Sequence, residues 1–210
     1  MMLSTNGGPA SPTADGWVNY AIPVIAGLMY RDSVEVDELK HPFRVETLGV
    51  VADSAGAGRF RGAPAREVTY AALENPVQVV IPCDGQFAPP RGVYGGHDGT
   101  PGSTHLIDHN GGIAKLPNLV NMQIRKDQRL RGRDSSGGGY GDPLTRDPLR
   151  VLTDVLEGYE SLGKARDVYG VVFTGRIEDD SLEVDVAATQ ARRADLAGQP
   201  RVRGLEPAAE

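Results

Sequence analysis

The chain has 210 residues, of which 27 are glycine and 15 are proline, so a fifth of it disfavours regular secondary structure. That share excludes a long coiled coil or an ordinary helical bundle, yet it stays below the level typical of disordered chains. A net charge of -6 argues against sequence-independent nucleic-acid binding, which needs a basic face. With 40% hydrophobic residues, the composition predicts one loop-rich globular domain around a modest core.

Residues 1–16 carry almost no apolar side chains, and they predict a flexible arm or an arm that lies on another subunit. In residues 32–38 acids alternate with Val34 and Val36, which favours a solvated strand face or a partner-facing surface. Residues 43–51 alternate as a half-buried strand does, and we expect this strand to end in a tight glycine loop.

Further strands are predicted in the middle of the chain. Residues 66–73 and 77–81 predict a hairpin that turns at residues 74–76. Two shorter strands are predicted at 103–107 and 119–125, with a glycine-bearing turn between them. The stretch before them, rich in glycine and proline, excludes regular structure.

The sequence changes character after residue 143. Asp147 and Pro148 are typical of a helix start, as N-cap and first helical residue. We expect this helix to end at Gly158 and to show one apolar face, made of Leu149, Leu152, Val155 and Leu156.

Residues 161–168 predict a second short helix, 170–174 a last strand, and 184–197 a terminal helix. Strands first and helices afterwards indicate an α+β protein, a strand-rich and loop-heavy domain followed by short C-terminal helices.

The glycine run at residues 136–141 allows two interpretations. Its backbone N–H groups could form an anion-binding nest, or the run could be a tight connection in which any Cβ would clash. The residues of a nucleotide-binding P-loop are missing, and we favour the tight connection.

The remaining reactive side chains predict no self-contained site. His105 and His109 would share one strand face at roughly 13 Å, too far apart to chelate one ion. His97 and Asp98 could face a ligand, although a solvated surface pair is the simpler interpretation. Cys83 has no neighbouring base in the sequence and predicts a packed structural thiol.

Cys83 is the only cysteine, so no internal disulfide and no paired-cysteine zinc site can form. One free cysteine fits a reducing cytoplasm. No apolar run reaches the roughly 18 residues that span a bilayer, and residues 1–15 lack the basic start of a signal peptide. We therefore expect a cytoplasmic protein without a membrane partner.

Several loops in chain order resemble those of the hydantoinase B/oxoprolinase family. The similar blocks are Asp15–Trp17, Asp32–Glu38, Asp53-Ser-Ala-Gly-Ala-Gly-Arg-Phe-Arg-Gly62, Pro90–Gly102, Ser136-Gly-Gly-Gly-Tyr-Gly-Asp-Pro143 with Arg146-Asp147-Pro148, and Ala165-Arg-Asp-Val-Tyr-Gly-Val-Val172. Ala55 and Ala63 stand where the family usually has glycine. The resemblance covers only the C-terminal part of longer family members.

The resemblance implies a subunit of an ATP-dependent enzyme that opens a cyclic amide, such as a lactam or a hydantoin. A related branch carboxylates ketones, and a non-catalytic scaffold subunit is a further alternative. The expected partners are a larger hydantoinase-B-like subunit with the family's N-terminal part and a hydantoinase-A-like subunit for ATP. ATP and a divalent metal are expected in those partners rather than in this chain, which would not be active alone.

The resemblance also suggests a division of the chain. We expect an arm at 1–16, a hydantoinase-B-like domain at 17–174, and a helical and partly disordered tail at 175–210. No catalytic residue is carried over. The residues expected next to a substrate or anion are Arg59, Arg61, Ser136, Gly137, Gly138, Gly139, Tyr140 and Asp142.

Overall fold

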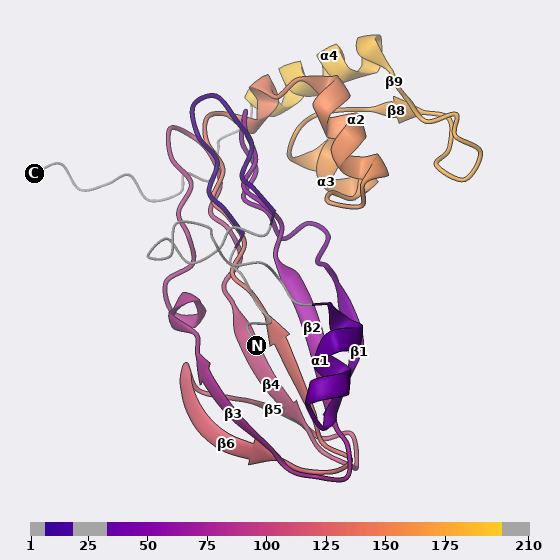
Figure 1. Cartoon of the computed structure of the whole chain (residues 1–210). Coiled ribbons are helices and arrows are strands. Elements are labelled where there is room, and N and C mark those ends of the chain that lie inside the picture. Colours follow the sequence, from indigo (N-terminus) through magenta and orange to yellow (C-terminus); the bar gives the residue numbers. More distant parts are fainter. Residues whose placement is uncertain (1–6, 19–32, 199–210) are drawn as a thin grey trace, which may run out of the picture.

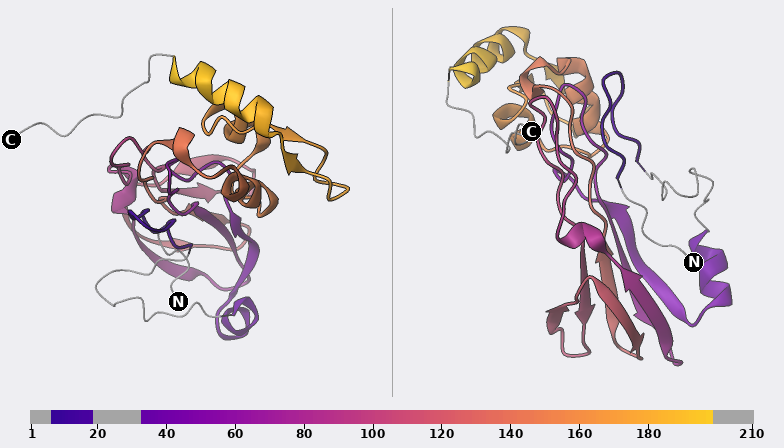
Figure 2. Two further views of the ribbon diagram at one scale, coloured as in Figure 1. Left: turned by 90° about the horizontal axis from the view of Figure 1, so that it is seen from above. Right: turned by 90° about the vertical axis from the view of Figure 1, so that its left-hand side faces the viewer.

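The protein is elongated, with three regions that follow one another along its length (Figure 1). Strands gather at one end, the C-terminal helices lie at the other, and long extended segments run between them (Figure 2). The computed structural model describes residues 7–18 and 33–198. Its strands and short C-terminal helices confirm the α+β class predicted from the sequence.

Antiparallel pairing holds the strand-rich end together. A five-stranded sheet contains, in spatial order, β1 (Phe43–Val50), β2 (Arg66–Ala72), β7 (Arg129–Arg133), β4 (Ser103–Ile107) and β5 (Ile113–Lys115). A separate pair consists of β3 (Val77–Pro82) and β6 (Leu119–Ile124). The strands predicted at 43–51, 103–107 and 119–125 are confirmed. The short β5 and the arginine-rich β7 were not predicted.

The predicted hairpin of residues 66–73 and 77–81 is wrong, although both strands exist. β2 pairs with β1 on one side and with β7 on the other, so neither of its edges is open to β3. β3 instead crosses to the second sheet and pairs with β6. Sequence proximity favoured a hairpin, whereas the pairing of β2 on both edges decided against it.

Apolar side chains from both sheets pack together and form the core of this end. The packing includes an edge-to-face contact between Phe43 and Tyr70, whose ring centroids lie 5.4 Å apart. β3 alternates between half-buried and exposed residues, which is the pattern of a strand that covers a core on one face. The buried members of this core are Phe43, Val68, Tyr70, Ala72, Ile124 and Leu130.

The acidic segment at residues 32–38 does not form the predicted strand; Asp32 itself lies outside the described residues. Residues Val34–Lys40 form helix α1. The Ser33 hydroxyl accepts a hydrogen bond from the Val36 N–H at 3.3 Å and caps the helix. A serine cap followed by acids in the first turn favours a helix start, and this local signal outweighs the alternation of two valines.

The opposite end contains α2 (Pro148–Leu156), α3 (Leu162–Asp167), a short hairpin of β8 (Phe173–Thr174) and β9 (Glu183–Val184), and α4 (Val186–Ala197). The three predicted helices are confirmed. Asp147 caps α2 as expected, because its carboxylate accepts the Leu149 N–H at 2.9 Å. No helix in the described ranges is long and apolar enough to cross a bilayer.

The predicted apolar face of α2 is partly wrong. Val151 and Val155 are buried in a core with Tyr169 and Val171, whereas Leu149 and Leu156 are 64% and 53% exposed. The helix therefore buries a face rotated away from the one that its leucines indicate.

Four extended segments form the middle region and lie side by side in both views (Figures 1 and 2). We call residues 7–17, 54–63, 90–102 and 135–141 the glycine bundle. Main-chain hydrogen bonds join these segments without forming a regular sheet; for example, Gly7 N–H donates to the Ser135 carbonyl at 3.0 Å, and Gly56 N–H donates to the Gly137 carbonyl at 2.9 Å.

The close approach of the segments requires glycine. A Cβ placed on Gly137 would collide with the carbonyl oxygen of Gly8, and a Cβ on Gly139 would collide with that of Ala57. The glycines of the bundle are therefore packing residues, because only a hydrogen atom fits between neighbouring main chains.

The expected N-terminal arm differs from its described part, residues 7–16. Ala10 N–H donates to the Gly138 carbonyl, and Gly16 N–H donates to that of Arg61. Backbone hydrogen bonds, rather than apolar side chains, order this stretch, so its composition gave no sign of it. The domain expected at 17–174 thus packs against residues that precede it.

Candidate functional site

The residues predicted to lie near a substrate or anion fall into two groups. Arg61 and Ser136–Gly139 are buried within the glycine bundle, whereas Arg59 is exposed, and Tyr140 and Asp142 are half-buried at its end nearest the helices. The structure therefore separates residues that the sequence grouped together.

The buried glycine run does not present its amides to a ligand. The N–H groups of Gly137, Gly139 and Tyr140 donate to the carbonyls of Ala63, His97 and Phe60, at 2.8–2.9 Å. An anion nest needs such groups to converge on a bound ion. The arrangement matches the tight connection that we favoured.

Ser136 clasps two segments of the bundle. Its hydroxyl donates to the Ser54 carbonyl at 2.6 Å and accepts from the Thr100 N–H at 2.6 Å. Its side chain is among the fully buried ones. Ser136 thus fixes the spacing of the segments and does not face solvent.

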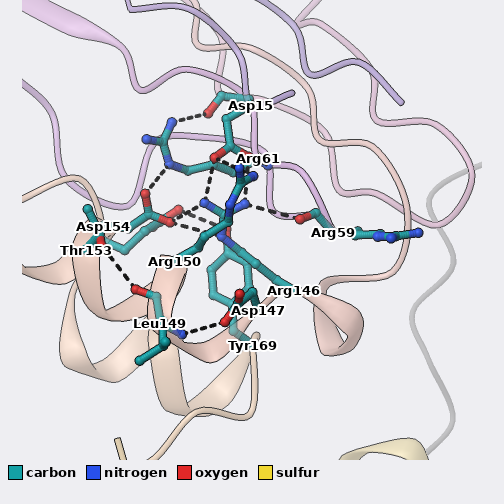
Figure 3. A network of polar contacts seen from close by, with 12 residues as sticks. Asp15, Arg59, Arg61, Arg146, Asp147, Leu149, Arg150, Thr153, Asp154 and Tyr169 are labelled. Atoms are coloured by element: carbon teal, nitrogen blue, oxygen red, sulfur yellow. Dashed lines mark hydrogen bonds and ion pairs between the residues drawn. The ribbon is translucent and has the colours of Figure 1, made fainter. Parts of the chain in front are cut away.

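A buried ion network lies where the bundle meets α2 (Figure 3). Arg61 Nε donates to Asp154 Oδ1 at 2.7 Å. Arg146 donates to Asp154 Oδ2 at 2.7 Å and to Asp15 Oδ1 at 2.6 Å. Two arginines and two aspartates balance in charge, and they tie together the N-terminal segment, the 54–63 segment and the first C-terminal helix.

Arg146 is the centre of this network. Its side chain is 1% exposed, and its guanidinium reaches both carboxylates and the Arg59 carbonyl. Burial alone would lower the pKa of Arg146, but its hydrogen bond to Asp15 and the charges of Asp154 and Asp15 raise it overall. A buried charge of this kind is tolerated only because its partners are in place.

Asp15 responds to the same contacts. Burial alone would raise the pKa of its carboxyl, but the hydrogen bond and charge of Arg146 hold it below its usual range. Asp15 also accepts the Arg61 N–H at 2.9 Å. The N-terminal segment is therefore locked to the network by an ionised aspartate.

The sequence did not predict this network. Asp15 and Arg146 belong to the blocks that resemble the family, but no role followed from the resemblance. The one available signal was Asp154, an acid between Val151 and Val155 on the buried side of α2. A charged residue on a buried helix face indicates a buried partner.

The exposed end of the bundle gathers aromatic and basic side chains. Bridge pairing brings Phe60 and Val93 against Tyr140, and the rings of Tyr94 and Tyr140 lie 5.2 Å apart. The guanidinium of Arg59 lies 5.7 Å, and that of Arg150 5.6 Å, from the centre of the Phe60 ring. We call this surface the bundle tip: Arg59, Phe60, Val93, Tyr94, Tyr140 and Arg150.

Tyr94 gives the bundle tip an unusual backbone. Its φ of 52° lies in the left-handed region, which costs a bulky residue conformational energy, and its side chain is 81% exposed. Strain that no packing explains concentrates at functional sites. The tip is therefore the surface of this chain best suited to contact another molecule.

Asp142 has a local structural task. Its carboxylate accepts the Leu144 N–H at 3.0 Å and so caps the 3₁₀ turn Pro143–Thr145. Asp142 thereby fixes the direction in which the chain leaves the bundle.

A second buried cluster anchors α3. Glu160 accepts a hydrogen bond from the Tyr169 hydroxyl at 3.1 Å and forms an ion pair with Lys164 at 2.9 Å. Lys164 Nζ also donates to the Asp53 and Ala55 carbonyls. Burial raises the pKa of Glu160 to about 7, so this carboxyl titrates near neutrality.

The other reactive residues stay apart. Burial raises the pKa of the Cys83 thiol, which does not activate it as a nucleophile. His105 lies on β4, whereas His109 falls in the turn after it. Asp98 accepts the Gly92 N–H.

No cofactor or metal site emerges from these residues. Within residues 7–18 and 33–198, no three His, Cys, Asp or Glu side chains converge as metal ligands. The glycine amides of the bundle donate to neighbouring carbonyls. We therefore assign no step through ATP or a metal ion to this chain's own residues.

The sequence matches a known family over most of its length. The family model for hydantoinase B/oxoprolinase matches residues 1–143. The beta subunit of the caprolactamase of Pseudomonas jessenii is 30% identical over 193 residues, which cover 90% of this chain and 32% of the relative. The hydantoinase-B component of a D-/L-hydantoinase of Pseudomonas sp. (strain NS671) is 32% identical over 164 residues, 76% of this chain and 26% of the relative.

Solved structures agree with the sequence comparison. The ATP-dependent caprolactamase from Pseudomonas jessenii superposes with a TM-score of 0.71 at 30% identity, over 91% of this chain and 33% of that chain. A nucleotide-free acetone carboxylase superposes with a TM-score of 0.72 at 22% identity, over 95% of this chain and 31% of that one, and supports the fold alone. The acetone carboxylase alpha subunit of Xanthobacter autotrophicus is 25% identical over 227 residues, 92% of this chain and 29% of the relative. The chain thus spans about a third of the length of these relatives.

Proposed function

This chain belongs to the hydantoinase B/oxoprolinase family, and from that premise we propose that it is the small subunit of an ATP-dependent enzyme that hydrolyses a cyclic amide. It would complete a hydantoinase-B-like component whose larger part is a separate chain, and a hydantoinase-A-like partner would bind ATP. The observation that carries the proposal is the match of 90% of this chain to about a third of a caprolactamase subunit.

The chemistry explains why such a reaction needs several subunits. Resonance makes a lactam carbonyl a poor acceptor for water, and ATP supplies the activation. In this proposal the partners bind ATP and a divalent metal, and this chain provides a wall of the substrate site. The single cysteine supports a cytoplasmic location for the assembly.

Within this chain, we assign the substrate-adjacent role to the bundle tip. Arg59 and Tyr140 would face the substrate or its anionic groups, because Arg59 is exposed there and its guanidinium suits carboxylate or phosphate. Arg61, Ser136–Gly139 and Asp142 would support the tip from behind. This division keeps every predicted residue near the site, but only two of them in contact with it.

Reconstitution tests the proposal. The full chain is co-expressed with a larger hydantoinase-B-like partner and a hydantoinase-A-like partner, and ATP-dependent opening of caprolactam and of hydantoin is measured with and without it. We expect co-purification and ring opening only when all three chains are present. A monodisperse chain that ignores both partners, or full turnover without it, would refute the proposal.

A carboxylase is the second candidate function, favoured by the likeness to the acetone carboxylase alpha subunit. The same assembly would then convert ATP, bicarbonate and a ketone into a β-keto acid. Incubation with labelled bicarbonate and acetone or acetophenone separates the two: label in an acid product supports the carboxylase, and its absence alongside ring opening supports the hydrolase. Assembly that survives with neither activity dependent on this chain would indicate a scaffold.

A further inference from the structure

The outer face of the five-stranded sheet carries an unusual set of basic residues. On β7, Leu130 is buried in the core, so Arg129, Arg131 and Arg133 lie on the opposite face. β7 is the central strand of the sheet. Three arginines therefore follow one line down the middle of this face, about 7 Å apart as alternate strand residues are.

A second line of basic residues crosses the first. Arg131 lies directly opposite His105 on β4, and His105 lies directly opposite Lys115 on β5. Neighbouring strands are roughly 5 Å apart, and like charges in directly opposed positions destabilise a sheet. The protein thus keeps an arrangement that its own folding does not favour, which is typical of a functional surface.

The flanks of this face are neutralised, but its centre is not. Arg129 pairs with Glu46 at 2.6 Å, and Arg133 pairs with Glu67 at 2.8 Å. Among the residues that the structure describes, Arg131 and Lys115 have no carboxylate partner. The positive charge is therefore concentrated on the crossing line.

His105 reports the resulting field. Burial and then the charges of Arg131, Lys115 and Arg133 lower the pKa of its imidazole, and only Glu67 opposes them. A carboxylate placed on this face would add a second opposing charge and raise that pKa.

We propose that the outer face of the five-stranded sheet, centred on Arg131, His105 and Lys115, binds an extended acidic segment of a protein partner. Charge complementarity carries the assignment: the patch is basic on a chain of net charge -6. An extended segment with acids at alternate positions repeats the spacing of the arginines on β7.

Protein fits this surface better than nucleic acid does. A polyanion would meet the flanking Glu46 and Glu67 and the net negative charge of the chain, whereas a short acidic segment needs only local cations. The inference concerns a docking surface and holds for either candidate reaction.

Peptide binding by the full-length chain tests the proposal. The probe is a fluorescein-labelled decapeptide that alternates glutamate with serine, and the reference peptide has glutamine in place of glutamate. The test variant is Arg131→Gln with Lys115→Gln. The matched control is Arg166→Gln with Arg176→Gln, which removes the same charge from exposed pairs at the helical end.

We expect one bound glutamate peptide per chain, about tenfold weaker binding by the test variant, and less than about twofold change in the control. The pKa of His105, followed by NMR titration, should rise when the peptide binds. Because like charges are removed, the test variant should also melt about 1–3 °C higher than the wild type.

Three results would overturn the proposal. The glutamate peptide fails to bind or binds no better than the glutamine peptide; the control variant weakens binding as much as the test variant does; or an oligonucleotide or inorganic phosphate displaces the peptide at lower concentration than free peptide. The last would assign the face to another anion.

Discussion

The strand-rich end and the glycine bundle are held together in opposite ways. In the strand-rich end, side chains such as Phe43, Tyr70 and Leu130 fill the space between two sheets. In the bundle, main chains touch one another, and their amides donate directly to neighbouring carbonyls. The first arrangement tolerates changes that preserve volume, whereas the second has no room for a single methyl group.

The two regions also use charge differently. The sheet shows its ion pairs on the surface, where they are half-exposed. The bundle buries Arg61, Arg146 and Asp154 at its junction with α2. Surface pairs contribute little to stability, whereas the loss of one partner from a buried set is costly. The predictions below use these contrasts.

The largest effect is expected for Gly137→Ala. Its Cβ would collide with the Gly8 carbonyl, and we expect a loss of about 5 kcal/mol or more in the free energy of unfolding. Gly49→Ala in β1 is the control, because nothing lies within 4 Å of its Cβ position; it should change stability by less than about 1 kcal/mol. Urea unfolding measures both, and equal losses would contradict the described packing of the bundle.

Arg146→Ala comes next, with an expected loss of about 3–5 kcal/mol, because Asp154 would remain buried without its main partner. Arg166→Ala removes an exposed pair with Asp167 and should cost less than about 0.5 kcal/mol. Chemical denaturation of both variants checks the difference. A loss below about 1 kcal/mol for Arg146→Ala would show that the network is not a lock between the bundle and α2.

The third prediction concerns pH. Burial raises the folded-state pKa of Glu160 from 4.5 to about 7, so the folded state holds its proton more tightly than the unfolded state does. The resulting stability is fully present below about pH 4.5 and is lost as the pH rises to about 7, on the order of 3 kcal/mol in total.

Glu160→Gln should remove that dependence. Urea unfolding between about pH 4.5 and 8 should show the wild type losing stability relative to the variant across this window. Parallel pH profiles for the two proteins would mean that the pKa of Glu160 is not raised in the folded state.

The strand-rich end was largely predictable from sequence, and the bundle was not. Period-two alternation at residues 43–51 and the cap at Asp147 are local signals, and both were confirmed. Residues 7–16 have no side-chain pattern, because their order comes from backbone contacts with segments far along the chain. The partner of β3 likewise depends on which edges other strands have already occupied.

The candidate site shows the same limit. The resemblance picked out residues 136–142 and Arg59, but no local pattern could distinguish buried Arg61 from exposed Arg59, two residues apart. Which arginine reaches Asp154 follows from how the 54–63 segment packs against α2. Tertiary contacts of this kind join residues 93 positions apart.

The smallest effect on stability, and the most informative on function, is expected at the bundle tip. Arg59→Gln combined with Tyr140→Phe changes an exposed and a half-buried side chain, and we expect less than about 1 kcal/mol of lost stability. Arg176→Gln, far along the helical end, is the control for a single lost charge.

The most direct measurement is ATP-dependent ring opening by the three-subunit assembly that contains the tip variant. Our account predicts that the variant still assembles and folds as the wild type does, while turnover falls by at least about tenfold, as expected when a group that contacts the reacting molecule is lost. Turnover equal to that of the wild type and of Arg176→Gln would contradict the claim that the bundle tip faces the substrate.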